Sequence, residues 1–222
     1  MKTHRPFSSY PARFRTVCTL ALLAAASAAT AQEAKPAKTP KPPPPIDLLT
    51  LDPLAGQSIP VLPITFLLSD SVAPADLPAG HRAQLLWADS IVGEAMQTRG
   101  PEVSWVLPPE LRTIAKRAPG MVTDPDKMGQ ALLRNDNFKK TVPDPLRSYL
   151  RALNALTDGR HVFVPASVRF FPAEAGVRVE VTTVLVDSRS GQILWRSHPV
   201  GHGATAAAAL TDAIAQILPD NK

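Results

Sequence analysis

The clearest pattern lies in the last third of the chain, where apolar and polar positions alternate with the period of a β-strand. In VRVEVTTVLV, every second residue from Val177 to Leu185 is apolar or threonine, and the residues between them begin with Arg178 and Glu180. We therefore expect one face of this strand to be buried and the other to be partly wet. Three strands should form an antiparallel meander, over residues 160–171, 177–186 and 192–197.

Upstream of the meander, short apolar strands alternate with helical patterns. We predict a buried strand over Ile59–Leu68, with Pro60 and Pro63 placing its start at an edge or bulge. A second short strand is expected over residues 102–107. Helices are predicted where apolar residues recur every three or four positions between proline, glycine or capping residues: 81–98, 108–118, 123–133, 145–159 and 204–218. These elements predict an α/β (α+β-like) fold: a mixed sheet with a carboxyl-terminal antiparallel meander and helices packed on the sheet.

The first 31 residues have the pattern of a secretory signal peptide. Basic residues without any acid precede the apolar run VCTLALLAAASAATA, and Ala29-Thr30-Ala31 supplies the small residues before a cleavage site at Gln32. A membrane-spanning helix needs about 20 residues, and neither this run nor any later stretch is long and apolar enough. We expect cleavage, no integral membrane span, and a location in the periplasm or the medium; an uncleaved signal anchor is the alternative.

Residues 32–58 are predicted to be a proline-rich linker and a lead-in. The segment EAKPAKTPKPPPP has almost nothing that could form a core and should be an extended spacer. Apolar residues return over 46–58 without clear periodicity, so we expect this lead-in to pack loosely. Residues 59–222 are long enough for a single α/β domain with its own core.

Charge and cysteine usage exclude several classes of protein. The formal charge of +5 belongs to the precursor: removing the four basic residues of the signal leaves 20 Lys and Arg against 19 Asp and Glu. A nearly neutral exported protein is a poor candidate for binding nucleic acid. Cys18 stands at the start of the apolar run and not after it, so lipid attachment is not expected. Without Cys18 the mature chain has no disulfide, thiolate metal site or cysteine nucleophile.

The hairpin VEVTTVLVDSRSGQILWRS, from Val179 to Ser197, resembles a family of envelope proteins. These are related to the TolB amino-terminal domain, the curli secretion lipoprotein and the activator lipoproteins of penicillin-binding proteins. Asp187, Gly191 and Trp195 match the turn pattern V-D-x-x-x-G-x-[IVL]-[LV]-W. The resemblance implies a non-enzymatic envelope domain that binds other proteins. The chain departs from the family in having no lipobox and no long amphipathic hairpins, so a secretion channel is not implied.

Three residues near the end of the meander are candidates for contact with a partner or a ligand: Trp195, His198 and His202. We expect Trp87 and Trp105 to be core residues and Trp195 to lie on a contact surface. The two histidines are four residues apart, but the proline and glycine between them prevent a regular helix and no third ligand is evident. We predict polar histidines at a strand end and no metal site.

The glycines of Gly201-His202-Gly203 are expected to open the final helix. Free backbone N–H groups there could hold an anion, but a tight strand-to-helix turn is the simpler explanation. Asp124, Asp126 and Gly129 resemble part of a calcium loop. Met128 stands at a ligand position, however, so we assign Asp124 to helix capping.

Motifs of hydrolases, metalloproteases and phosphate-binding loops are not found in the sequence, and we expect no cofactor and no enzymatic activity. Our first hypothesis is an exported soluble envelope protein whose domain binds another envelope protein from a flexible tether. The alternative is a small-molecule binder or hydrolase in the periplasm that uses the His198–Gly203 turn. That alternative requires both histidines and a carboxylate to converge in one pocket.

Overall fold

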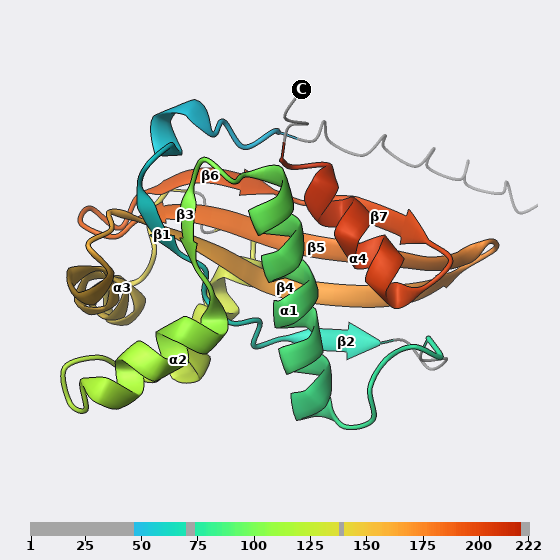
Figure 1. Ribbon diagram of the computed structural model, residues 1–222, viewed down its shortest axis with the longest axis horizontal. Coiled ribbons are helices and arrows are strands. Elements are labelled where there is room, and N and C mark those ends of the chain that lie inside the picture. The colour runs from blue at the N-terminus through green and yellow to red at the C-terminus, as the bar shows by residue number, and fades with distance from the viewer. Residues whose placement is uncertain (1–46, 70–73, 138–139, 219–222) are drawn as a thin grey trace, which may run out of the picture. The chain divides into compact units, whose positions relative to one another are not determined.

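A long antiparallel hairpin, β4 paired with β5, forms the centre of the fold in the computed structural model (Figure 1). The structure describes residues 47–218 except 70–73, 138 and 139. The predicted signal peptide, its predicted cleavage site, Cys18 and the proline-rich segment lie outside the described residues. The strands are β1 Ser58–Pro60, β2 Leu67–Ser69, β3 Ser104–Val106, β4 His161–Ala173, β5 Gly176–Asp187, β6 Ile193–Ser197 and β7 Val200–Gly203. The predicted meander corresponds to β4, β5 and β6 and is confirmed.

The sheet is mixed because β2 joins the meander in parallel. β2 pairs with β4, while β6 and β7 follow one another along the opposite edge of β5. β1 pairs in parallel with β3. The single strand predicted over 59–68 is therefore wrong: it is divided into β1 and β2. Pro60 and Pro63 have no N–H to donate to a ladder, and the N–H of Ile64 is bound by the side chain of Asp89.

Within the described residues, four α-helices cover the sheet: α1 His81–Arg99, α2 Pro108–Arg117, α3 Asp144–Thr157 and α4 Ala206–Ala215. All four were predicted, but the predicted helix over 123–133 is wrong. Two short 3-10 helices, η2 Pro125–Lys127 and η3 Gln130–Arg134, replace it. Gly129 between them has φ 75°, a left-handed conformation that interrupts a regular helix.

Helix α4 begins later than predicted. Its N-cap is Thr205, whose side chain accepts a hydrogen bond from the N–H of Ala208. The Gly201-His202-Gly203 triplet does not open the helix, because it forms β7. Its glycines serve close packing: a Cβ on Gly201 would lie 2.0 Å from the carbonyl oxygen of Ala209 in α4.

Both faces of the sheet carry a hydrophobic core. Helices α1 and α4 lie across one face (Figure 1), over the side chains of Val179 and Val181. The second core, with residues of α2, α3 and η3, includes Val184 and Val186. The face of β5 that was expected to be partly exposed to solvent is therefore exposed only at the Arg178 end of the strand.

The lead-in before β1 is part of the core. Three leucines of this segment are at most 3% exposed: Leu49, Leu51 and Leu54. Leu54 lies in the short 3-10 helix η1 Asp52–Leu54. The N–H of Leu49 donates to the carbonyl of Ile217 after α4, at 2.8 Å. The expectation of loose packing was wrong, because these leucines cover one edge of the core. Within the described residues, every helix is too short or too polar to cross a membrane.

Candidate binding surface at the edge of the meander

A β-bulge in the outer strand β6 turns a leucine into solvent. The register pairs Leu185 with Trp195 and Val186 with Ile193, so Leu194 has no opposite residue. A bulge of this kind bends an edge strand and redirects its side chain. The side chain of Leu194 is 48% exposed, although its neighbours on both sides pack on the cores.

Trp195 is held in a fixed position beside Leu194. Its ring lies 6.3 Å from that of Phe163, and its Nε1–H donates to the carbonyl of Asp47 at 3.1 Å. The indole is partly exposed and partly packed on the first core. Trp195 therefore presents a pre-organised aromatic surface whose polar group is already bonded.

Trp105 lies in the core, as predicted, and Trp87 packs at the edge of the core. Trp105 is 7% exposed, and its Nε1–H donates to the carbonyl of Gly100 at 2.8 Å. Trp87 is half-buried against the ring of Phe170, at 6.1 Å between centroids. Of the three, Trp195 borders the hollow described next.

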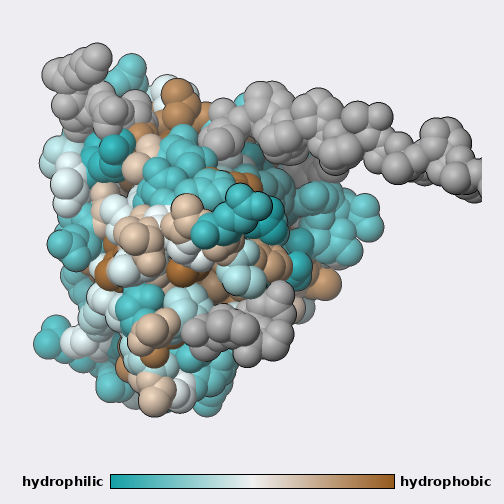
Figure 2. Space-filling view, turned by 90° about the vertical axis from the view of Figure 1, so that its right-hand side faces the viewer, coloured by the Kyte–Doolittle hydropathy of each residue, from teal (hydrophilic) through white to brown (hydrophobic). Residues whose placement is uncertain are grey.

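A hollow of about 420 Å³ lies beside β6. Its apolar part is formed by Ile193, Leu194 and Trp195, and its charged rim includes Asp136 and Arg196. Apolar and aromatic residues together with charged ones are the usual composition of a protein–protein contact. The face seen in Figure 2, which is the right-hand end of the molecule in Figure 1, instead shows hydrophobic and hydrophilic residues interspersed.

His198 belongs to the charged rim. Its Nε2 lies 3.0 Å from a carboxylate oxygen of Asp136, and its Nδ1 lies 3.3 Å from the hydroxyl of Thr182. Asp136 also lies 3.7 Å from the guanidinium of Arg196, which donates to the carbonyl of Leu133 at 2.6 Å. Burial lowers the pKa of Arg196, and the charge of Asp136 opposes that shift.

The structure does not bring His202 to the same place. His202 lies on β7 opposite Arg178, is exposed, and is not among the residues that line the hollow. Its backbone N–H donates to the carboxylate of Asp212 in α4 at 3.0 Å. Gln216, the C-cap of α4, donates in turn to the carbonyl of Val200 at 2.9 Å, so side chains at the end of α4 cover the edge of β7. Groups of three metal-ligating side chains are absent from the residues that the structure describes.

The residues that carry the family resemblance have different roles. Asp187 shapes the turn, because its Oδ1 accepts from the N–H groups of Arg189 and Ser190. Burial opposes ionisation of Asp187, but these hydrogen bonds and the nearby guanidinium lower its pKa. Gly191 has φ 75°, which permits the turn. Trp195 is the member of this pattern that borders the hollow.

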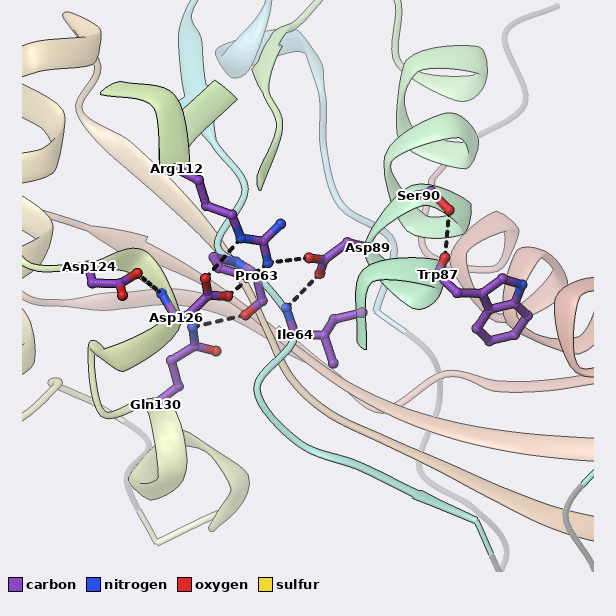
Figure 3. Close-up of polar contacts among 9 residues, drawn as sticks. All are labelled: Pro63, Ile64, Trp87, Asp89, Ser90, Arg112, Asp124, Asp126 and Gln130. Carbon is purple, nitrogen blue, oxygen red and sulfur yellow. Dashed lines mark hydrogen bonds and ion pairs between the residues drawn. The ribbon is translucent and has the colours of Figure 1, made fainter. Parts of the chain in front are cut away.

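A second polar site, which the sequence reading missed, lies where α1, α2 and η2 meet (Figure 3). Arg112 of α2 points between two carboxylates: its Nη2 is 2.7 Å from Asp89 and 2.8 Å from Asp126, and its Nε donates to Asp126 at 2.9 Å. The other oxygen of Asp89 accepts the N–H of Ile64 at 2.8 Å. Gln130 extends the network by donating to the carbonyl of Pro63.

Burial governs the electrostatics of this network. Asp89 is 4% exposed, and its desolvation raises its pKa to about 6 despite the hydrogen bonds from Ile64 and Arg112. Asp126 is more exposed, and Arg112 lowers its pKa. Asp124 accepts a hydrogen bond from the N–H of Asp126 and so caps η2. The predicted capping role is confirmed, although the capped helix is a 3-10 helix. The network connects α1, α2 and η2. In the sequence, the feature that indicates it is Asp89, an acid among the apolar residues of α1.

Comparisons with known proteins find solved structures of low sequence identity and low TM-score. No protein-family model matches the chain, and no curated protein matches it in sequence. The LpoB C-terminal domain from Salmonella enterica is 12% identical with a TM-score of 0.40, covering 67% of this chain and 84% of that one. The PelC dodecamer from Paraburkholderia phytofirmans is 15% identical with a TM-score of 0.36, covering 79% and 96%. Lipoprotein GNA1162 from Neisseria meningitidis is 17% identical with a TM-score of 0.34, covering 66% and 81%.

Proposed function

We propose that this chain is an exported, non-enzymatic protein whose α/β domain binds another protein of the cell envelope through the Leu194–Trp195 surface. The signal-peptide pattern of residues 1–31 supports export, and the proline-rich linker supports a domain carried on a tether. The surface is defined by Ile193, Leu194 and Trp195 with the charged rim of Asp136 and Arg196.

The bulge at Leu194 is the observation that carries the proposal. A regular β6 would place alternate side chains on the two cores, and the extra residue instead exposes a leucine at the edge of the sheet. Burying a leucine on a partner contributes roughly 1.5–3 kcal/mol. The rigid indole beside it adds apolar area at little cost in conformational entropy, because Phe163 and Asp47 already hold it.

The charged rim supports recognition of one partner over others. Asp136 pairs with both Arg196 and His198, and all three residues line the hollow. A partner must match this arrangement of charge or leave a buried charge unpaired, which is a source of specificity. The hydrolase alternative needs both histidines and a carboxylate in one pocket, whereas His202 lies on β7 opposite Arg178 and lines neither of the cavities that His198 and Asp136 border.

Site-directed photo-cross-linking in cells tests the proposal. A photoreactive amino acid at Leu194 is expected to capture one specific envelope protein, and the same group at Leu156 on α3 serves as the matched control. Leu156 is 38% exposed, so both sites present a comparable leucine to solvent. Mass spectrometry of the captured complex also reads the mature amino terminus, which we expect at Gln32.

Binding of the captured protein to purified variants gives the quantitative test. Leu194→Asp is expected to weaken binding by more than about tenfold, because a carboxylate would replace an apolar anchor. Leu156→Asp should leave the affinity unchanged. Equal cross-linking at the two sites, or equal affinities of the two variants, would contradict the proposal.

A further inference from the structure

A pair of arginines converges on one aromatic ring, that of Phe66. The guanidinium of Arg134, from η3, lies 3.9 Å from the centre of the Phe66 ring, and that of Arg169, from β4, lies 5.7 Å from it. Arg134 uses its Nε–H to bond the carbonyl of Ala166, which leaves its two terminal nitrogens available. Within the described part of the chain, no ion pair joins either arginine to an acid.

These arginines border a cavity of about 230 Å³ on the wet end of the meander face. Two hydroxyl groups also line it, from Ser167 on β4 and Thr182 on β5, in residues that are 4% and 8% exposed. The hydroxyl of Ser167 has no hydrogen-bond partner among the described residues. Because Ser167 lines the cavity, its hydroxyl can donate a hydrogen bond to a group bound there.

The acids around the cavity are already engaged. Asp136 pairs with His198 and Arg196, and Glu180 pairs with Arg178 at 3.0 Å. Glu180 stands directly opposite Arg169 in the ladder but makes its ion pair along its own strand. Arg134 and Arg169 therefore line the cavity together with the hydroxyl-bearing residues Ser167 and Thr182 and with His198. Burial and the charge of Arg169 lower the pKa of Arg134, as expected for cations held close together.

We propose that Arg134, Arg169 and Ser167 form a binding site for a phosphate group. A phosphate monoester carries about two negative charges near neutral pH, which matches two unpaired guanidinium groups better than a single carboxylate does. Its oxygens accept hydrogen bonds from arginine in a fork and from hydroxyl groups. The cavity is smaller than the usual range for drug-sized ligands and suits a small oxyanion. The cavity shares Asp136 and His198 with the rim of the hollow beside β6, but Arg134, Arg169 and Ser167 do not line that hollow, so the phosphate site does not depend on the proposed protein partner.

Titration of the mature chain with inorganic phosphate at constant ionic strength, followed by calorimetry and by the arginine side-chain NMR signals, tests the site. The wild-type chain should bind phosphate saturably, and Arg169→Gln should weaken binding by roughly tenfold or more. Arg169 is exposed, so this variant is expected to fold. Arg151→Gln, an exposed arginine on α3, is the matched control and should bind as the wild type does.

Glu180→Gln provides a test in the opposite direction. Removing this negative charge from the border of the cavity should tighten phosphate binding, a gain that a misfolded variant would not produce. Glycerol phosphate and vesicles of phosphatidic acid then distinguish a soluble phosphate ester from a lipid headgroup, and saturable binding of either supports the site. Absence of saturable phosphate binding, equal binding by wild type and Arg169→Gln, or weaker binding by Glu180→Gln would overturn the proposal.

Discussion

Replacing Asp89 by alanine should destabilise the fold more than replacing Asp126, although both carboxylates bind the same arginine. Asp89→Ala leaves the N–H of Ile64 buried without its acceptor, at a cost of about 1–3 kcal/mol, and removes a charged hydrogen bond worth about 1.5–3 kcal/mol. Release of the carboxylate from its buried position offsets part of this loss. The raised pKa of Asp89 reflects that unfavourable burial.

We expect a net loss of about 2 kcal/mol for Asp89→Ala near pH 7. Asp126→Ala should cost about 1 kcal/mol or less, because its side chain is 28% exposed and Arg112 keeps its bond to Asp89. Urea unfolding followed by tryptophan fluorescence measures both values. Equal losses for the two variants, or a larger loss for Asp126→Ala, would refute the assignment of Asp89 as the buried centre of the network.

The pH dependence of stability gives an independent check on Asp89. Its pKa rises from 3.8 in the unfolded chain to about 6 in the folded one, so between these values the folded state binds more protons. The stabilisation that protonated Asp89 contributes to the folded state is fully present below about pH 4 and is lost as the pH rises through about 6. Lowering the pH from about 7 to about 5 should therefore stabilise the wild-type chain by about 1 kcal/mol relative to Asp89→Ala. A pH-independent difference between the two proteins would contradict this reasoning.

Three further predictions concern packing and edge protection. Gly201→Ala should lower the free energy of unfolding in urea by at least about 2 kcal/mol, because the new Cβ would meet the α4 backbone. The control Gly100→Ala should lower it less, because the nearest atom to its Cβ belongs to a side chain, at 3.2 Å. Phe163→Leu should cost about 1–2 kcal/mol and alter the near-ultraviolet circular dichroism, because the ring contacts two tryptophans at 6.3 Å; an unchanged spectrum would refute the contacts. Asp212→Ala should speed hydrogen exchange at the His202 amide, because the carboxylate accepts that N–H, while unchanged exchange would mean that the edge is closed in another way.

Sequence patterns predicted the elements whose signals are local. The two-residue alternation of β5 and the turn after Asp187 define the meander, because side chains on a strand point alternately to its two faces. The helices α1 and α2 were found from their apolar period together with proline and glycine at their ends. Trp195 was predicted to lie on a contact surface from its place at the meander's end; the structure places it beside the hollow, and its contact role stays a prediction.

What the sequence by itself determined is therefore the meander and the four α-helices, because their signals depend on neighbouring residues. Only the tertiary structure decided the bulge at Leu194, the network of Asp89, Arg112 and Asp126, and the pairing of Arg134 with Arg169 around Phe66. Each of these depends on which distant segments are brought side by side. No periodicity within one segment encodes that choice, because it is made by the packing of helices on both faces of the sheet.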